Sequence, residues 1–286
     1  MRSSTRIITR CIGNDIRPFS TTTTPTTTPL YIVYGASGGI GSDLVRRLTQ
    51  NQENAHVVLA GRNLTALDAV TASLPPSISS TTTSTHAVDV LDPISVDQFT
   101  AAIIKQHGHV DGVVNCIGSV ILKSAHATTL DEFHECLQTN LYSSFNILKS
   151  SVKAMMKNEG GSGSGRGSGG SIVFCSSAVA QHGLANHEAI AAAKGGISAM
   201  ALSAAATYAP KNIRINCVAP GLTRTPLSSR ITSNEAALKA SIAMHALKRI
   251  GEPEDVAEAI EFLLKSRFIT GQVLAVDGGL SKVRSV

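Results

Sequence analysis

A glycine-rich turn between an apolar strand and a helix constrains this chain most strongly. The apolar run 31–34 leads into Gly35, Gly39 and Gly41, and a helix-like segment follows at 42–48. Glycine lets the backbone turn sharply and approach a bound group closely. A helix N-terminus adds free N–H groups and the positive end of a dipole. The turn therefore predicts a nucleotide pyrophosphate site, with an ordinary tight turn as the alternative.

Strand-like and helix-like segments alternate along the rest of the chain. After the first strand, strands are expected at 56–62, 85–90, 110–116, 171–175, 213–218 and 272–276, and helices at 63–74, at 130–158 and between the fifth and sixth strands. This alternation predicts a parallel sheet covered on both faces. A chain of 286 residues with 43% hydrophobic content can bury one large core. The expected fold is therefore a single doubly wound α/β domain over 30–286.

The N-terminal segment differs in composition from the rest. Residues 1–19 contain four arginines and a single acid, with apolar residues at helical spacing, which is typical of a mitochondrial presequence. We expect cleavage after Phe19, a disordered Thr/Pro linker over 20–29 and a mitochondrial matrix location. The alternative is an ordinary N-terminus of a cytoplasmic protein. A Gly/Ser-rich stretch at 159–170 is expected to form a flexible surface insertion.

Composition narrows the range of partners. The formal charge of +5 includes the N-terminal arginines, and without residues 1–19 it falls to +2, so no nucleic-acid surface is implied. The five cysteines are scattered without a Cys-x-x-Cys pair, which favours buried thiols over disulfides or a metal site. No apolar run is expected to span a membrane.

Short motifs follow the glycine turn in a characteristic order. They are Asp89-Val90, Asn115-Cys116-Ile117-Gly118, Asn140, Ser177, Lys194, Pro220-Gly221 with Thr225, the run 249–256, Thr270-Gly271-Gln272 and Asp277-Gly278-Gly279. Together they resemble the short-chain dehydrogenase/reductase family over residues 30–281. The resemblance implies a Rossmann-type fold with a seven-stranded parallel sheet flanked by helices. It also implies a homotetramer or homodimer joined through the helix at 130–158 and the helix after Lys194.

The end of the second expected strand bears on the choice of cofactor. An acid at this position normally holds NAD(H), whereas NADP(H) needs a cation. Gly61 takes the place of the acid, and Arg62 follows it. Arginine can bind the 2′-phosphate through charge-assisted hydrogen bonds. The sequence therefore favours NADP(H) over NAD(H), unless Arg62 is a solvated surface residue.

The resemblance assigns further cofactor contacts. It places Asp89 at the adenine amino group, Asn115 on the adenosine side, and Thr225 at the pyrophosphate or carboxamide end. The expected cofactor-binding residues are Gly35, Ser37, Gly39, Ile40, Gly41, Arg62, Asp89, Asn115, Gly118, Lys194, Pro220, Gly221 and Thr225.

The expected catalytic centre departs from the family pattern. The family tyrosine lies four residues before the lysine, and here that position is Ile190, which cannot transfer a proton. His187 stands seven residues before Lys194, which is the tyrosine-to-lysine spacing of the enoyl-reductase branch. Histidine can transfer protons near neutrality, so His187 is the candidate proton donor, ahead of Glu188. Alternatively, both residues only cap or solvate the helix start.

The remaining site residues are Ser177, Lys194 and Asn140. Lys194 is expected to bind the nicotinamide ribose, and Ser177 and Asn140 to orient a carbonyl or hold a water molecule. The stretch 222–247, which includes His245, is expected to form an apolar cover over a hydrophobic substrate. Three functions fit this pattern. We favour an NADP(H)-dependent oxidoreductase that reduces a carbonyl or a conjugated C=C. The alternatives are a non-redox isomerase or lyase and a non-catalytic NADP-binding subunit.

Overall fold

The computed structural model describes residues 28–51, 55–75, 83–158 and 169–283. The expected presequence at 1–19, nearly all of the linker at 20–29 and nearly all of the insertion at 159–170 lie outside the described residues. The domain boundaries therefore stay predictions.

Seven parallel strands in the described residues form one sheet. Its order is β3-β2-β1-β4-β5-β6-β7, and every neighbouring pair is parallel. The strands are β1 (Leu30–Tyr34), β2 (His56–Gly61), β3 (Thr83–Ala87), β4 (Gly112–Asn115), β5 (Gly170–Cys175), β6 (Ile213–Pro220) and β7 (Val273–Val276). The sequence-based prediction of a doubly wound, seven-stranded parallel sheet is confirmed.

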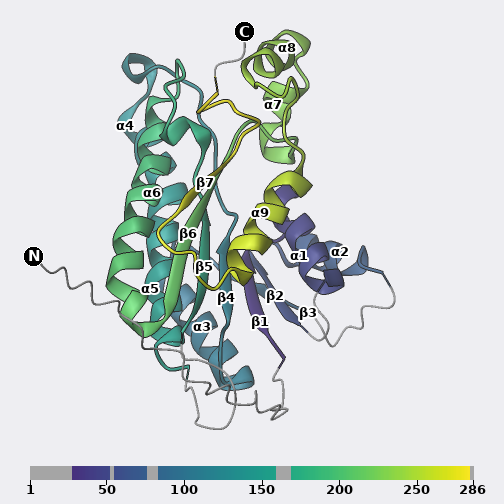
Figure 1. The fold of residues 1–286 in the computed structure, drawn as a ribbon, viewed down its shortest axis with the longest axis vertical. Helices are drawn as coiled ribbons and strands as arrows, with labels where there is room; N and C mark the ends of the chain where they lie inside the picture. Colours follow the sequence, from purple (N-terminus) through teal and green to yellow (C-terminus); the bar gives the residue numbers. More distant parts are fainter. Residues whose placement is uncertain (1–27, 52–54, 76–82, 159–168, 284–286) are drawn as a thin grey trace, which may run out of the picture.

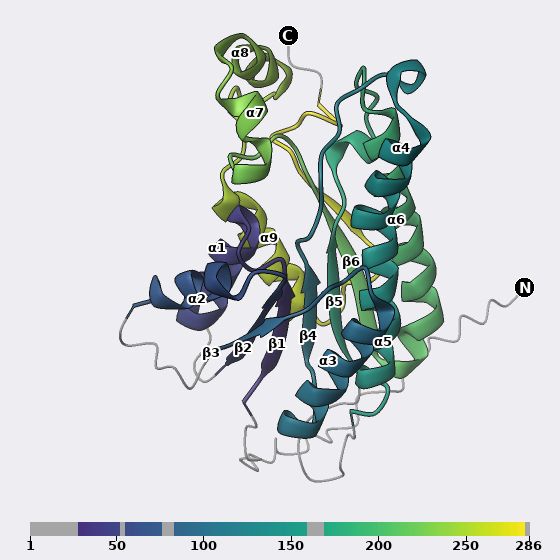
Figure 2. The same cartoon turned by 180° about the vertical axis from the view of Figure 1, so that it is seen from behind.

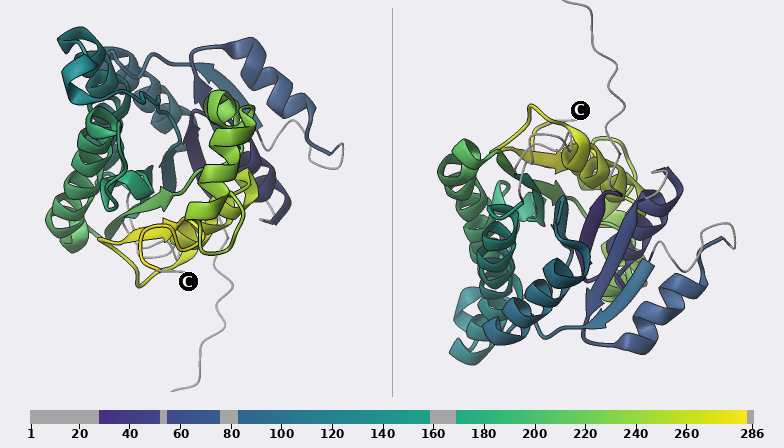
Figure 3. Two further views of the ribbon diagram at one scale, coloured as in Figure 1. Left: turned by 90° about the horizontal axis from the view of Figure 1, so that it is seen from above. Right: turned by 90° about the horizontal axis from the view of Figure 1, so that it is seen from below.

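Helices cover both faces of the sheet (Figures 1 and 2). One face carries α1 (Gly39–Asn51), α2 (Leu64–Ala72) and α9 (Pro253–Lys265). The other carries α3 (Pro93–His107), α4 (Leu130–Leu137), α5 (Ser143–Met155) and α6 (Glu188–Tyr208). The views along the vertical axis show the sheet between these two layers (Figure 3). Two short helices, α7 (Ser229–Thr232) and α8 (Glu235–Met244), lie beyond the carboxyl end of β6.

The strands bury side chains on both faces. Within β1, Leu30, Ile32 and Tyr34 pack in one apolar core, whereas Tyr31 and Val33 pack in the core on the opposite face. Successive strand residues point to opposite faces, so a continuous apolar run is what a strand covered on both sides requires. The apolar sequence of β1 therefore accounts for its central place in the sheet.

The third strand begins and ends earlier than the sequence pattern predicts. It spans Thr83–Ala87 instead of 85–90. Val88 and Val90 belong to the core, but they lie in the connection after the strand. Because both valines are buried, the sequence there looks like a strand, although they do not pair with a neighbouring strand. Since β3 ends at Ala87, Asp89 lies two residues beyond its end.

The expected helix at 130–158 is interrupted by a π-helical turn at Gln138–Tyr142. The side-chain amide of Asn140 donates to the carbonyl of Cys136 at 2.9 Å, and the hydroxyl of Ser144 donates to the carbonyl of Asn140 at 2.6 Å. Such side-chain bonds compete with the regular helical ladder. Single π-turns inside helices are frequent at functional sites, and this one contains the candidate residue Asn140.

One segment is long and apolar enough to cross a membrane. Residues Glu188–Lys211 contain a window with a mean hydropathy of 1.4, of which 44% is buried inside the structure. The expectation that no apolar run reaches this length is therefore wrong on length and composition. Helix α6 lies within the segment, and its Ile197, Ala201 and Ala204 belong to the core beside the sheet. Packing within the domain accounts for the buried part of this window.

Replacing Gly41 with alanine is expected to destabilise the fold. A Cβ atom at Gly41 would lie closer to the Gly35 carbonyl oxygen than van der Waals contact allows, and 2.9 Å from the Cα of Ala36. Because these are backbone atoms, we expect a loss of about 3 kcal/mol in the free energy of unfolding.

The matched control is Gly195→Ala, since no atom lies within 4 Å of its added Cβ. Inside α6 this change should stabilise the protein by up to about 1 kcal/mol. Urea denaturation of both variants checks the pair, and equal effects would contradict the assigned crowding at Gly41.

Candidate functional site

The turn between β1 and α1 has the geometry of an anion site. Gly35 adopts a positive φ of 74°, and its carbonyl accepts the N–H of Gly38 at 3.0 Å. Helix α1 begins at Gly39 and has no acidic residue in its first turn. The first N–H groups of a helix lack partners within the helix, and its dipole favours an anion there. This turn can hold a phosphate group.

A groove of about 300 Å³ runs past this turn. Arg62 lies on its wall after β2 and is exposed, and among the described residues no group forms a hydrogen bond or ion pair with its guanidinium. Asp89 also lines the groove, and its carboxylate accepts the N–H of Leu91 at 3.0 Å. The sequence-predicted cofactor residues on this groove are Gly35, Ser37, Gly39, Ile40, Gly41, Arg62, Asp89, Gly118 and Thr225.

Asn115 is the last residue of β4, and its expected place on the adenosine side of the cofactor stays a prediction. Its side chain is buried, donates to the Ser144 hydroxyl at 3.0 Å and accepts the N–H of Ile117 at 2.9 Å. It lines neither the groove nor the neighbouring cavity. In this structure, Asn115 shapes the turn after β4, which carries Gly118.

Gly118 is the point at which two candidate catalytic residues approach each other. A Cβ atom on Gly118 would lie 3.0 Å from Asn140 Oδ1 and 3.1 Å from Lys194 Nζ. Lys194 is 8% exposed and donates to the carbonyl of Cys175 at 2.9 Å, and burial lowers its pKa. Asn140 is fully buried, and its side-chain amide forms hydrogen bonds with Ser119. Asn140 thus supports the loop beside Lys194 without lining the groove or the cavity.

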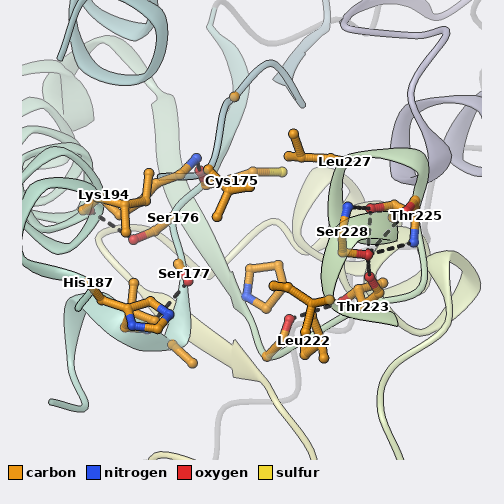
Figure 4. A pocket seen from close by; sticks show the side chains of 18 of the residues that line it. Cys175, Ser176, Ser177, His187, Lys194, Leu222, Thr223, Thr225, Leu227 and Ser228 are labelled. Atoms are coloured by element: carbon orange, nitrogen blue, oxygen red, sulfur yellow. Dashed lines mark hydrogen bonds between the residues drawn. The ribbon is translucent and has the colours of Figure 1, made fainter. Parts of the chain in front are cut away.

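A cavity of about 320 Å³ adjoins the groove and shares part of its wall, including Ile40, Cys116 and Gly118. Side chains from two parts of the chain face each other across it (Figure 4). His187, Ser177 and Lys194 lie on one side, and the loop after β6 with Leu222 and Thr223 lies on the other. Of the predicted apolar cover, Leu222, Leu227, Ile231 and Met244 line the cavity. Pro220 and Gly221, predicted for the cofactor, also lie here.

The cavity wall formed by α6 combines one apolar and two polar side chains. Ile190 is 4% exposed and packs with Cys136, which removes it from solvent. His187 directly precedes α6, and its Nδ1 lies 2.7 Å from the carbonyl oxygen of Ala185. A carbonyl oxygen only accepts, so Nδ1 carries the proton and Nε2 is left for a ligand. The helix therefore brings His187 and Lys194 to one cavity.

A pair of thiols sits where the groove and the cavity meet. Cys116 directly follows β4, Cys175 is the last residue of the neighbouring strand β5, and their sulfur atoms are 3.9 Å apart. Contact between the two thiols lowers the pKa of Cys175 and raises that of Cys116. Sequence analysis assigned these cysteines only to the core, and their scattered numbering carries no signal of this pairing.

The structure thus brings together most of the predicted site, but on two adjoining surfaces. Ser177, His187 and Lys194 line the cavity, and the glycine turn and Arg62 line the groove. Asn140 and Asn115 are buried and line neither surface. Thr139 also lines the groove, although no motif in the sequence marks it. The buried His245 lines the cavity, although its segment was expected only to cover a substrate.

Comparison with known proteins agrees with this geometry. The model of the family described as "Enoyl-(Acyl carrier protein) reductase" matches residues 35–281. Carbonyl reductase family member 4 of Danio rerio is 34% identical over 258 residues, covering 88% of this chain and 97% of that protein. The 3-oxoacyl-(acyl-carrier-protein) reductase FabG of Thermotoga maritima is 30% identical over 256 residues, covering 87% and 96%.

Solved structures of similar fold also include a dehydrogenase/reductase. A short-chain type dehydrogenase/reductase from Mycobacterium ulcerans superimposes with a TM-score of 0.80 at 27% identity, covering 88% of this chain and 90% of that chain. A structure described as ElxO with NADP bound gives a TM-score of 0.78 at 27% identity, covering 88% and 98%. The fold is therefore shared with these proteins.

Burial of Lys194 predicts a pH-dependent contribution to stability. The pKa of Lys194 is lower in the folded protein than in the unfolded chain, where it is about 10.4. Between these two pKa values the unfolded chain therefore binds more protons than the folded protein does. Stability should therefore rise with pH in this window, by at most about 1.4 kcal/mol per pH unit. The increase should be absent in Lys194→Met. Urea melts at a series of alkaline pH values measure the difference, and parallel curves for the two proteins would contradict it.

Proposed function

Because the chain belongs to the short-chain dehydrogenase/reductase family, we propose that it is an NADP(H)-dependent oxidoreductase. It reduces a carbonyl or conjugated enoyl group on a hydrophobic small molecule. One observation carries this proposal: the phosphate-binding groove beside Arg62 opens into an apolar cavity whose wall holds Ser177, His187 and Lys194. NADPH, when bound, supplies the hydride.

The groove supports NADP(H) over NAD(H). Gly61 offers no carboxylate to a ribose hydroxyl, and Arg62 next to it has no protein partner among the described residues. A guanidinium matches a phosphate in both charge and geometry. The Gly38 and Gly39 backbone at the start of α1 is suited to the pyrophosphate, and Lys194 to the nicotinamide ribose.

The cavity supports a role for three side chains at the reacting group. The Ser177 hydroxyl accepts the N–H of Val179 at 3.3 Å, which leaves its own proton to polarise a carbonyl oxygen. In its doubly protonated form, His187 takes the place of the tyrosine as proton donor: the Nδ1 proton stays bonded to the Ala185 carbonyl, and Nε2 gives up the other proton. Lys194 adds positive potential from its buried position. Apolar side chains around them exclude water, which strengthens each of these interactions.

We further propose a homodimer or homotetramer and a mitochondrial matrix location. Exposed Tyr142, Phe145 and Leu202 lie on the outer face of the layer formed by α5 and α6, which supports subunit contacts there. The Arg-rich composition of residues 1–19 supports import into mitochondria.

Charge reversal at Arg62 should change the cofactor preference. In Arg62→Glu, we expect NADPH to bind roughly 10- to 100-fold more weakly, because a charge-assisted contact with the 2′-phosphate is replaced by repulsion. NADH binding should be unchanged or stronger. Fluorescence titration with both cofactors measures this, with Lys211→Glu, before the start of β6, as the control. Equal weakening of both cofactors would contradict the role of Arg62.

Removal of the imidazole at position 187 tests the proton donor. His187→Phe should lower kcat about 100-fold with ketones and conjugated enones, while the dissociation constant for NADPH stays the same. His182→Phe is the control, because His182 lies outside the cavity wall. Oxidation of NADPH is followed by absorbance. Unchanged turnover in His187→Phe would exclude His187 as the donor, and turnover on no substrate would contradict the proposed reductase.

A further inference from the structure

Two thiols lie in contact at the junction of the groove and the cavity. The sulfur atoms of Cys116 and Cys175 are 3.9 Å apart, and both cysteines line the cavity. Cys116 is partly exposed and also lines the groove, and Cys175 lies beside Lys194 in the cavity wall (Figure 4). The proposed reductase chemistry uses neither sulfur atom, so the pair has no role in that reaction.

The sheet holds the two cysteines in a position from which a disulfide can form. Asn115 pairs with Phe174 in parallel register, so Cys116 and Cys175 are the next residues opposite each other. Neighbouring strands lie about 4.8 Å apart, within the range of about 4.4–6.8 Å that a disulfide requires between its Cα atoms. An S–S bond is about 2 Å long, so the sulfur atoms need to approach each other by only about 1.9 Å.

The pair also has the features that distinguish reactive thiols from buried, inert ones. Contact between the thiols lowers the pKa of Cys175 and raises that of Cys116, so a thiolate forms more readily on Cys175. Both cysteines line the cavity, and Cys116 is partly exposed, so a small oxidant can reach the pair. By contrast, burial raises the pKa of Cys217 to about 12, and this thiol is fully buried.

We propose that Cys116 and Cys175 form a redox modification site, at which a peroxide produces a disulfide that weakens cofactor binding. First, the Cys175 thiolate attacks a peroxide oxygen, the O–O bond breaks, and a sulfenic acid and water form. Then the Cys116 sulfur displaces the sulfenic hydroxyl as water and forms the S–S bond. In total, the two thiols lose two electrons and two protons, and one hydrogen peroxide is reduced to two water molecules.

Both ends of this disulfide are connected to groups assigned to the cofactor. A Cβ atom on Gly35 would lie 3.0 Å from the carbonyl carbon of Cys116, so a shift of Cys116 acts on the glycine turn. The carbonyl of Cys175 accepts from Lys194 Nζ at 2.9 Å, so a shift of Cys175 moves Lys194. We therefore expect the oxidised protein to bind NADPH at least about tenfold more weakly. This effect rests on the proposed cofactor, whereas formation of the disulfide does not.

The test is peptide mapping of the full chain after treatment with hydrogen peroxide. Because the chain has five cysteines, free thiols are alkylated under denaturing conditions and linked peptides are identified by mass spectrometry. We expect a Cys116–Cys175 disulfide that dithiothreitol removes, and a loss of NADPH affinity in proportion to it, measured by fluorescence titration. Cys116→Ala and Cys175→Ala should each form no such disulfide, and peroxide should not change their affinity for NADPH.

The control is Cys217→Ala, because Cys217 is buried in the neighbouring strand β6 and pairs with Phe174. This variant should form the disulfide and lose affinity as the unmodified protein does. If the reduced protein binds no NADPH, the proposed cofactor fails, while the peptide map still decides the disulfide. Peroxide treatment that leaves Cys116 and Cys175 unlinked would overturn the inference, and so would a disulfide that leaves NADPH affinity unchanged.

Discussion

Parallel pairing of β1 with both β2 and β4 forms the part of the sheet edge on which the groove is built. Because these strands run in the same direction, their carboxyl ends meet at one edge of the sheet, and the strand order reverses between β1 and β4. Ligands of doubly wound sheets bind at such a reversal. The glycine turn after β1, Arg62 after β2 and Gly118 after β4 therefore come together although they are far apart in sequence. Ser177 after β5 and the loop after β6 extend the same edge into the cavity.

At this edge, close packing of small residues allows polar groups to meet. Gly118 leaves room for both Asn140 and Lys194, and Gly221 leaves room for His245. Lys194 is held by the Cys175 carbonyl, so its position depends on the end of β5 as well as on α6. A side chain at either glycine would displace these groups. The chemistry of the site therefore depends on backbone positions as much as on the reactive side chains.

The sequence predicted the fold well because burial on both faces leaves a strong signal. The apolar run of β1 and the glycines after it identify the first strand, turn and helix without any tertiary information. The end of β3 was misplaced because Val88 and Val90 are buried without pairing in the sheet. The π-turn at Asn140 was missed because its side-chain bonds, from Asn140 to Cys136 and from Ser144 to Asn140, cannot be recognised from periodicity.

The site was predictable only in part, for a related reason. Motifs identify which residues lie near the carboxyl edge, but not whether a side chain faces the ligand. Asn115 turns inward to Ser144, whereas His245, which lies in a segment of mixed composition, turns its unpaired nitrogen toward Gly221. Such orientations depend on contacts between segments distant in sequence.

The most direct test of the central claim is isotope transfer from the cofactor. The full chain would be incubated with an apolar ketone or enone and NADPH deuterated at C4 on one face or the other of the nicotinamide ring, and the product analysed by mass spectrometry. We predict deuterium on the former carbonyl carbon, or on the β-carbon of the enone, from one face only. Product formed without deuterium from either cofactor would contradict hydride transfer and favour a non-redox reaction in the same cavity.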